Sequence, residues 1–151
     1  MEHFSYRKLR VYEESKNFVL FVYNLLKQFP REENYALCDQ LRRAVISIPS
    51  NIAEGMGRNS LKEQIHFIEI AFGSLNEVMC QIELAHDLNF IHKDQLTTAE
   101  SYYKNISQML SGLRRKRFEA MQRHSFTNPT ALQSTNVPSH SPLTNTNGVQ
   151  R

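Results

Sequence analysis

Apolar residues recur at alternating steps of four and three along residues 61–82, and this repeat restricts the fold more than any other feature of the sequence. Its members are Leu61, Ile65, Ile68, Phe72, Leu75, Met79 and Ile82. Steps of three and four place side chains on one face of an α-helix, whereas a strand requires steps of two. An average step of 3.5 residues also favours left-handed, near-parallel packing between helices. The sequence therefore predicts a long helix that packs along neighbouring helices.

This helix is expected to span about 60–89. Ser60 and Glu63 have the spacing of a capping box, in which a hydroxyl and a carboxylate satisfy free amides at a helix start. A second row of apolar or small residues follows the same helix and comprises Phe67, Ala71, Ser74, Val78, Ala85 and Leu88. Because two such rows cover much of the helix surface, we expect this helix to contact several neighbours and to leave an apolar face for assembly with other copies.

Three further segments have helical periodicity, at about 8–28, 32–56 and 94–123. The residues predicted to face the core are Val11, Ser15, Phe18, Val22, Leu25, Phe29, Leu37, Leu41, Val45, Ile48, Ile52, Leu96, Ala99, Tyr103, Ile106, Leu110 and Leu113. Short breaks between long helices make each helix antiparallel to the one before it. The predicted fold is therefore an all-α, up-down-up-down antiparallel four-helix bundle with left-handed packing.

The breaks between these segments follow from local chemistry. Pro30 ends the first segment because proline disfavours helical geometry in the residue before it. Glu32 and Glu33 are acidic and suit the start of the second segment, where the helix dipole favours negative charge. Pro49 lies inside the second segment, and its missing N–H predicts a kink or a loosened turn at 48–50.

The domain organisation is expected to be one bundle followed by a tail. A length of 151 residues suits a single domain, and the low counts of Gly (5) and Pro (5) favour helices over a turn-rich β fold. From residue 125 onward Ser, Thr, Asn and Pro dominate, and Arg151 is the only formal charge. Such a segment buries too little apolar surface to offset its ordering entropy. We therefore predict a bundle over 1–124 and a flexible tail over 125–151.

Several classes of protein are disfavoured by the sequence. The N-terminus lacks the apolar run of a secretory signal, and the longest uncharged apolar-rich run, 17–26, is about half of the roughly 20 residues that span a bilayer. We therefore expect a cytoplasmic protein that does not enter a membrane. Cys38 and Cys80 are far apart and form no Cys-x-x-Cys pair, so they are interpreted as buried free thiols.

Neither a metal site nor an enzyme is predicted. Glu63 and His66, and Glu83 and His86, have the Glu-x-x-His spacing of di-iron bundles. Both pairs lie on one helix, about 30 Å apart at 1.5 Å per residue, so they cannot converge on one ion. The sequence also lacks a Gly-x-Ser-x-Gly elbow and a phosphate-binding glycine loop. We expect a non-enzymatic protein without a cofactor.

The stretch 40–55, followed by Gly57 and Arg58, resembles the signature of the bacterial-type 23S rRNA intervening-sequence proteins. The signature residues are Gln40, Arg42, Arg43, Ser47, Pro49, Ser50, Asn51, Glu54, Gly55 and Arg58. The resemblance implies a four-helix bundle that assembles into a homopentamer. That family also includes the accessory variability protein of diversity-generating retroelements, so the resemblance further implies a reverse transcriptase and its template RNA as partners.

Part of this signature forms a polar stripe on the second helix. Its members follow one another at steps of three or four and are Gln40, Arg43, Ser47, Ser50, Glu54 and Arg58. One interpretation is that the stripe lines a binding groove. The other is that Arg43 and Glu54 belong to a structural hydrogen-bond network and that Glu54 pairs with Arg58, four residues on.

The charge distribution is uneven. Residues 104–123 contain six basic residues against Glu119 alone, whereas residues 61–94 contain two basic and six acidic residues. One interpretation is attraction between neighbouring helices or protomers. The other is a phosphate-binding surface, because antiparallel helices place the start of the first and the end of the fourth at the same end of the bundle. Its candidate residues are Arg7, Lys8, Arg10, Arg114, Arg115, Lys116 and Arg117.

The function that these patterns favour is nucleic-acid binding, to an RNA or DNA backbone, by an oligomer whose symmetry repeats the basic end. The alternatives are a protein-interaction or structural oligomer without nucleic-acid affinity, and an accessory partner of a reverse transcriptase. No base-reading motif is present, so the sequence predicts no preference for a particular nucleotide sequence.

Overall fold

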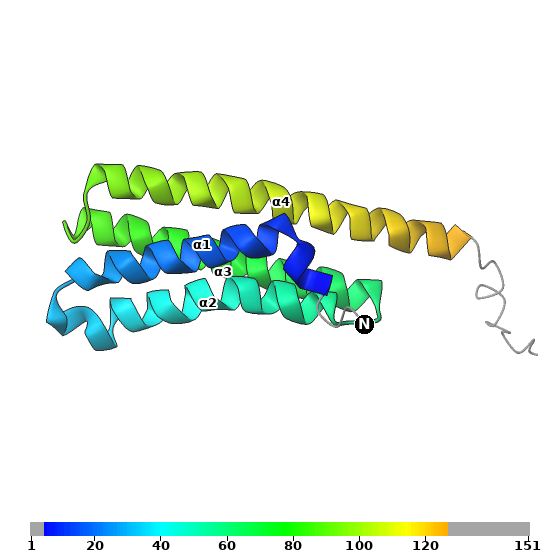
Figure 1. Ribbon diagram of the computed structural model, residues 1–151, viewed down its shortest axis with the longest axis horizontal. Helices are drawn as coiled ribbons and strands as arrows, with labels where there is room; N and C mark the ends of the chain where they lie inside the picture. The colour runs from blue at the N-terminus through cyan, green and yellow to red at the C-terminus, as the bar shows by residue number, and fades with distance from the viewer. Residues whose placement is uncertain (1–4, 127–151) are drawn as a thin grey trace, which may run out of the picture.

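The computed structural model describes residues 5–126, and every regular element within that range is helical. The four long helices are α1 (Arg10–Leu25), α2 (Leu37–Met56), α3 (Leu61–Asp87) and α4 (Lys93–Phe126). Short 3-10 turns η1 (Ser5–Lys8), η2 (Leu26–Gln28) and η3 (Arg31–Tyr35) precede or connect them. Figure 1 shows the four long helices side by side, with the chain reversing direction at each connection. The protein is thus an all-helical four-helix bundle.

The helices enclose a core because each contacts two others. α2 packs against α1 and α3, and α4 packs against α3 and α1, which closes the bundle. The largest fully buried side chains come from all four helices and are Phe18, Leu41, Ile48, Ile52, Ile68, Leu75, Ile82, Ile106, Leu110, Val22, Val45 and Val78. Their spacing along each helix is the predicted alternation of three and four, so hydrophobic burial accounts for the helix faces.

α4 is the longest helix and extends past the end of the bundle, as Figure 1 shows. It includes residues 125 and 126, the first two of the predicted tail. The rest of that predicted tail, 127–151, lies outside the described residues. Among the residues of α4 whose burial is described, none after Leu110 is buried.

The start of α2 differs from the prediction. The chain forms the 3-10 turn η3 after Pro30, and α2 begins at Leu37 rather than near residue 32. The acidic side chains still serve the helix start, because Glu33 Oε2 accepts a hydrogen bond from the Leu37 backbone N–H at 3.4 Å. Glu33 therefore caps α2 from the preceding turn rather than from within its first turn.

α2 continues without a break past Pro49, so the loosened turn predicted at 48–50 is not observed. The two residues that follow Pro49 add side-chain hydrogen bonds to carbonyls one turn earlier in the helix. Ser50 Oγ donates to the Ile46 carbonyl at 2.9 Å, and Asn51 Nδ2 donates to the Ser47 carbonyl at 2.8 Å. Packing of α2 against both α1 and α3 holds the remaining helical turns in place.

The two apolar rows of α3 are used inside the monomer. From the first row Ile65, Ile68, Leu75, Met79 and Ile82 are buried, and from the second row Ala71, Ser74, Val78 and Ala85 are buried. Only the last member of the second row, Leu88, is exposed among the large side chains of that row. The two predicted rows are therefore mostly covered within the monomer by α2 and α4, and the large apolar side chains left exposed along α3 and at its C-terminal end are Ile70, Leu84 and Leu88.

Candidate nucleic-acid interface

The first turn of α1 lies against the second half of α4, and a hollow of about 360 Å³ separates their side chains. We call it the Arg10 hollow. Its lining residues are Leu9, Arg10, Val11, Met109, Gly112, Leu113, Arg115 and Lys116. Three of the seven candidate phosphate-binding residues, from two helices far apart in sequence, thus lie around one depression.

Local structure explains why Arg10 reaches this place. Leu9 has an extended backbone (φ −81°, ψ 123°), and its carbonyl accepts the N–H groups of Tyr12 and Glu13 at 3.0 and 3.2 Å. α1 therefore starts sharply at Arg10, whose side chain is exposed. On α4 the lining residues follow steps of three and four, which places them on one helix face: Met109, Gly112, Leu113 and Lys116.

The rim of the hollow keeps its positive charge. Within residues 5–126, no carboxylate lies at ion-pair distance from Arg10 or Lys116. Arg115 Nε lies 4.0 Å from Glu119 Oε1, and both side chains are more than half exposed. An ion pair of that length in water contributes little, so the Arg115 guanidinium remains available to a phosphate.

Arg114 and Arg117 face the bundle instead of the hollow. Arg114 Nη1 lies 3.9 Å from Glu69 Oε1, and its guanidinium lies 5.4 Å from the centre of the Phe72 ring. Arg117 Nη2 lies 3.3 Å from Met56 Sδ, and its Nε is buried without a hydrogen-bond partner in the described part of the chain. The four consecutive cations are therefore divided between two sides of α4, because successive residues of a helix point about 100° apart.

Arg7 and Lys8 lie in η1, which contacts both α1 and α2. Both side chains are exposed, and neither is among the described residues that line the Arg10 hollow. The turn is held in part by Tyr6, whose ring packs edge-on against Tyr12 at 4.8 Å. The structure therefore brings together Arg10, Arg115 and Lys116 and leaves the other four candidates elsewhere.

The signature of the second helix divides into ion pairs and an interhelical contact. Glu54 pairs with Arg58, as the structural interpretation predicts, and both residues also line a hollow with Tyr6, Ser50, Ala53 and Gly57, which agrees with the groove interpretation. Arg43 pairs with Asp39 rather than joining a network with Glu54. Two more signature residues take no part in these ion pairs. Arg42 Nη1 donates a hydrogen bond to the Asn34 carbonyl at 3.4 Å, and Gln40 is exposed.

Three further signature residues, Ser47, Asn51 and Gly55, join α2 to α3. Ser47 Oγ lies 2.8 Å from Ser74 Oγ and accepts a hydrogen bond from Asn51 Nδ2 at 2.8 Å. A Cβ added at Gly55 would lie 2.8 Å from the Phe67 Cβ, so only glycine permits this approach of the two helices. These residues are explained by packing, and they do not line the Arg10 hollow.

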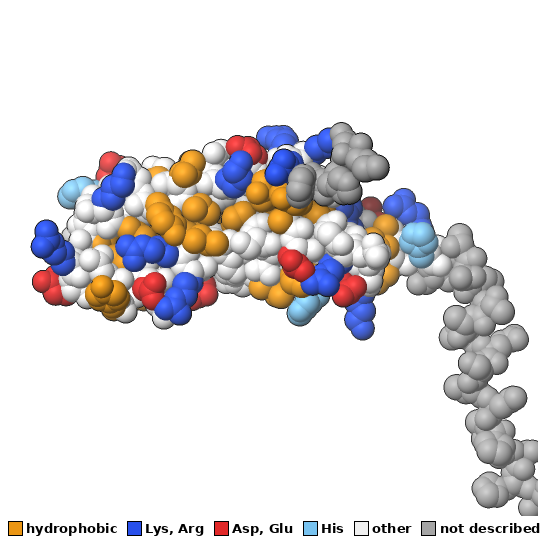
Figure 2. Space-filling view, turned by 60° about the horizontal axis from the view of Figure 1, so that its bottom comes forward, with side chains coloured by type: hydrophobic (Ala, Val, Ile, Leu, Met, Phe, Trp, Pro, Cys, Tyr) orange, Lys and Arg blue, Asp and Glu red, His pale blue; other side chains and the backbone are white. Residues whose placement is uncertain are grey.

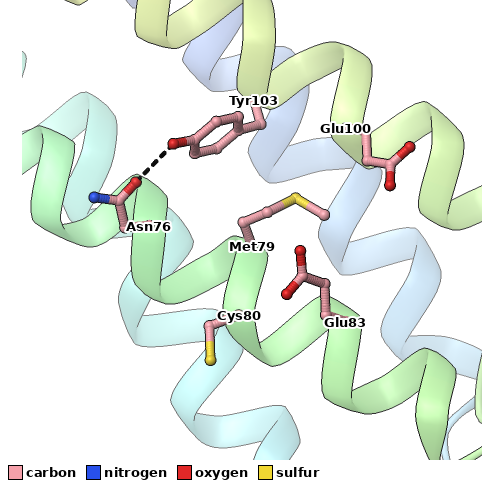
Figure 3. A pocket seen from close by; sticks show the side chains of 6 residues that line it. All are labelled: Asn76, Met79, Cys80, Glu83, Glu100 and Tyr103. Carbon is pink, nitrogen blue, oxygen red and sulfur yellow. Dashed lines mark hydrogen bonds between the residues drawn. The ribbon is translucent and has the colours of Figure 1, made fainter.

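A second hollow lies between α3 and α4 and has the opposite charge. Figure 3 shows its lining residues, which are Asn76, Met79, Cys80, Glu83, Glu100 and Tyr103. The Tyr103 hydroxyl donates to Asn76 Oδ1 at 2.9 Å across the hollow. Two carboxylates repel phosphate, so a polyanion is favoured at the Arg10 hollow and disfavoured here. The only signal for this site in the sequence is the acidic character of residues 61–94.

The two cysteines differ in burial. Both are free thiols and Cys38 is buried as predicted, but Cys80 is exposed, so the prediction of a buried thiol is wrong there. Burial raises the pKa of the Cys38 thiol, Arg42 lowers it to a smaller extent, and Glu33 raises it further. Since only the thiolate is a strong nucleophile, Cys38 is suited to packing. Within the described residues, no group of three His, Cys, Asp or Glu side chains could hold a metal ion.

An apolar groove runs between α1 and α2, and Figure 2 shows apolar side chains gathered along this face. Its lining residues are Tyr12, Lys16, Val19, Leu20, Ile46, Pro49, Ser50 and Ala53. Leu20 is 69% exposed and Ile46 is 43% exposed. We call this surface the α1–α2 groove.

In the described part of the chain, no helix is long and apolar enough to cross a bilayer.

Comparisons with known proteins agree with the helical fold. No curated protein matches the chain. A crystal structure of a protein of unknown function from the S23 ribosomal protein family of Bacteroides thetaiotaomicron matches with a TM-score of 0.64 and 25% sequence identity, covering 69% of this chain and 97% of that chain. The family model of the 23S rRNA-intervening sequence protein matches residues 7–112, a range that includes α1 to α3, most of α4 and the Arg10 side of the hollow. The chain therefore belongs to the 23S rRNA-intervening sequence protein family.

Proposed function

We propose that this protein is a non-enzymatic, cytoplasmic nucleic-acid-binding protein that contacts the phosphates of RNA or DNA through the rim of the Arg10 hollow. The observation that supports this most is the convergence of Arg10 with Arg115 and Lys116, three exposed cations from two helices. A polyanion gains affinity when cations replace its condensed counterions, and this gain does not depend on sequence. The absence of a base-reading motif agrees with a backbone-directed function.

We also propose that the bundle, with up-down-up-down topology and left-handed packing, assembles into the homopentamer that the family resemblance implies. Three cations in one protomer give weak binding, whereas a ring of protomers presents the same rim several times to one strand. The α1–α2 groove is the surface that favours assembly, because its exposed Leu20 and Ile46 would lose contact with water in an interface. Sedimentation is expected to give about five times the 17.6 kDa of one chain.

A second candidate function is protein interaction without nucleic-acid affinity, including an accessory role beside a reverse transcriptase. The α1–α2 groove favours it, since its apolar lining suits a partner helix as well as a second copy. Under this alternative, substitutions in the groove abolish partner binding, and substitutions around the Arg10 hollow have no effect.

The experiment that separates the two functions compares two triple variants. Arg10→Ala, Arg115→Ala and Lys116→Ala remove the rim cations. Lys27→Ala, Arg31→Ala and Lys93→Ala remove the same charge from exposed residues at the other end of the bundle, where Gln28 Nε2 donates to Gln95 Oε1 at 3.0 Å.

Binding of a fluorescent 20-nucleotide RNA is measured by anisotropy at low salt. We expect the first triple variant to bind at least tenfold more weakly than the second, with the oligomer intact in both. Equal weakening by the two variants would mean that net charge alone determines affinity, and no binding by the wild type would refute the proposed function.

A further inference from the structure

We infer that the Arg10 hollow holds one unstacked base of a single-stranded nucleic acid, while Arg10, Arg115 and Lys116 contact the flanking phosphates. This inference rests on the proposed function and makes it more specific. A backbone-binding surface needs only cations, and those cations favour a duplex because of its higher charge density. The hollow adds an apolar site that only a base outside a duplex can occupy.

The floor of the hollow is apolar. Leu9 and Val11 contribute from the start of α1, and Met109 and Leu113 contribute from α4. Val11 is buried, and the other three side chains are half-buried, so the floor belongs to the edge of the core. A nucleobase has flat apolar faces and gains affinity by leaving water for such a surface. A phosphate alone gains nothing from this floor.

The size of the hollow suits one nucleotide. Its volume of about 360 Å³ is close to the lower end of the roughly 300–1,000 Å³ found for small-molecule sites. It is lined from two helices only, so it is open along its length and a strand could enter and leave it. The bases of a duplex are stacked and paired in its interior, so a duplex cannot insert one without disruption.

The cations lie on two sides of the apolar floor. Arg10 comes from α1, whereas Arg115 and Lys116 come from α4, so a strand whose base enters the hollow passes a cation on either side. The guanidinium groups of Arg10 and Arg115 are planar and able to stack on a base as well as to pair with a phosphate. The arrangement therefore matches the alternation of base and phosphate along a single strand.

Gly112 leaves the hollow open. It lies in the interior of α4, where glycine is about 1 kcal/mol less favourable than alanine. A Cβ added at Gly112 would meet no heavy atom within 4 Å among the described residues, so packing does not require glycine there. The residue lines the hollow, and a side chain at this position would occupy space that the hollow now offers.

Gly73 provides a matched control. It lies in the interior of α3, is exposed, and would likewise give an added Cβ no neighbour within 4 Å in the described structure. Gly112→Leu and Gly73→Leu therefore make the same chemical change in two helices, at positions where an added Cβ meets no neighbour among the described residues. Only the first change places a side chain at the Arg10 hollow.

The test measures binding of two 20-nucleotide single strands by full-length protein, one of uridines and one abasic throughout, at the same low salt. Wild-type protein is expected to bind the uridine strand several-fold more tightly than the abasic strand, because the abasic strand has no base to bury on the aliphatic floor or to stack on a guanidinium. Gly112→Leu is expected to lower uridine-strand affinity to the abasic level and to leave abasic-strand affinity within about twofold. Gly73→Leu is expected to match wild type with both strands.

Two results would overturn the inference while leaving the proposed function intact. One is equal wild-type affinity for the uridine and abasic strands, which would show that phosphates alone are recognised. The other is unchanged uridine-strand affinity in Gly112→Leu with its helical circular dichroism retained. If wild-type protein binds neither strand, the proposed function and this inference are both wrong. The wild-type comparison between strands needs no variant, so equal affinities overturn the inference even if Gly112→Leu folds poorly.

Discussion

The hydroxyl oxygens of Ser47 on α2 and Ser74 on α3 lie 2.8 Å apart at the interface between the two helices. Ser74 is buried, and Ser47 also accepts a hydrogen bond from the Asn51 amide at 2.8 Å. A polar contact at this position favours one register between two otherwise apolar helix faces, because sliding by one turn would leave the Ser74 hydroxyl only the Ile70 carbonyl of its own helix, 3.1 Å away. The Ser47–Ser74 contact thus relates a family signature residue to the packing of the bundle.

Replacing Ser47 by alanine is expected to destabilise the protein by about 1–2 kcal/mol, since Ser74 loses a partner and Asn51 loses an acceptor. Urea denaturation followed by circular dichroism measures the change. Ser50→Ala is the control, because Ser50 is exposed and bonds only to the Ile46 carbonyl of its own helix among its described contacts. Its effect is expected within about 0.5 kcal/mol of wild type. Equal effects of the two substitutions would show that the interhelical contact does not stabilise the fold.

Gly55→Ala is expected to destabilise the bundle by about 1–3 kcal/mol, because its Cβ would lie 2.8 Å from the Phe67 Cβ and would force α2 and α3 apart. Gly73→Ala makes the same change in α3, where the Cβ has open space, and is expected to stabilise the fold by about 0.5–1 kcal/mol. Thermal melting of both variants checks the opposite signs. A Gly55→Ala melting temperature at or above that of wild type would contradict the close-packing account.

The helices could be predicted from the sequence because the apolar repeat is long and regular. The start of α2 could not, because Glu32 and Glu33 suit the first turn of a helix and equally the 3-10 turn that they form. The register between α2 and α3 could not be predicted from the sequence either. Nothing in the sequence indicates that Ser47 would meet Ser74, 27 positions away, since a residue pattern gives the faces of helices and not their relative height.

The candidate site could be predicted in part. The antiparallel arrangement of the helices predicted that Arg10 lies near Arg115 and Lys116. It did not distinguish these two residues from Arg114 and Arg117. A signal for their separation was present. Arg117 follows Ile106, Leu110 and Leu113 at the same steps of four and three, so it continues the core-facing row of α4 and turns toward Met56. The apolar floor and the open position at Gly112 depend on how closely α1 approaches α4, which only the structure gives.

The division of the four cations predicts different effects for two double variants. Arg115→Ala with Lys116→Ala is expected to weaken single-strand binding several-fold with little change in stability, because both side chains are exposed. Arg114→Ala with Arg117→Ala is expected to lower stability by about 1 kcal/mol through loss of the contacts to Phe72 and Met56.

Both double variants are compared with wild type in two measurements. Fluorescence anisotropy with a 20-nucleotide RNA gives binding, and urea denaturation gives stability. Both variants lose two positive charges, so their long-range effects on a polyanion are matched. The placement of these cations on two sides of α4 would be contradicted by one result. In that result, the Arg114 and Arg117 double variant would weaken binding as much as the Arg115 and Lys116 double variant and would leave stability unchanged.

The two thiols are expected to react at very different rates with iodoacetamide. Cys38 is buried and its thiol pKa is raised, so at pH 8 it has less thiolate than an ordinary cysteine and little access to the reagent. Cys80 is exposed and is expected to be labelled first. Intact-mass spectrometry of native protein should show one added group per chain, and denatured protein should show two. Rapid double labelling of the native protein would mean that Cys38 is not enclosed by the core.

The claim that the cations at the rim of the Arg10 hollow contact phosphates is tested most directly by the salt dependence of single-strand binding. For single strands the slope of log K against log salt is about −0.7 for each phosphate contact, so loss of three contacts reduces its magnitude by about 2. In the Arg10, Arg115 and Lys116 triple alanine variant, the magnitude of the slope is expected to fall by about 2 for each protomer that the strand contacts. The same slope in wild type and the triple variant would contradict the account.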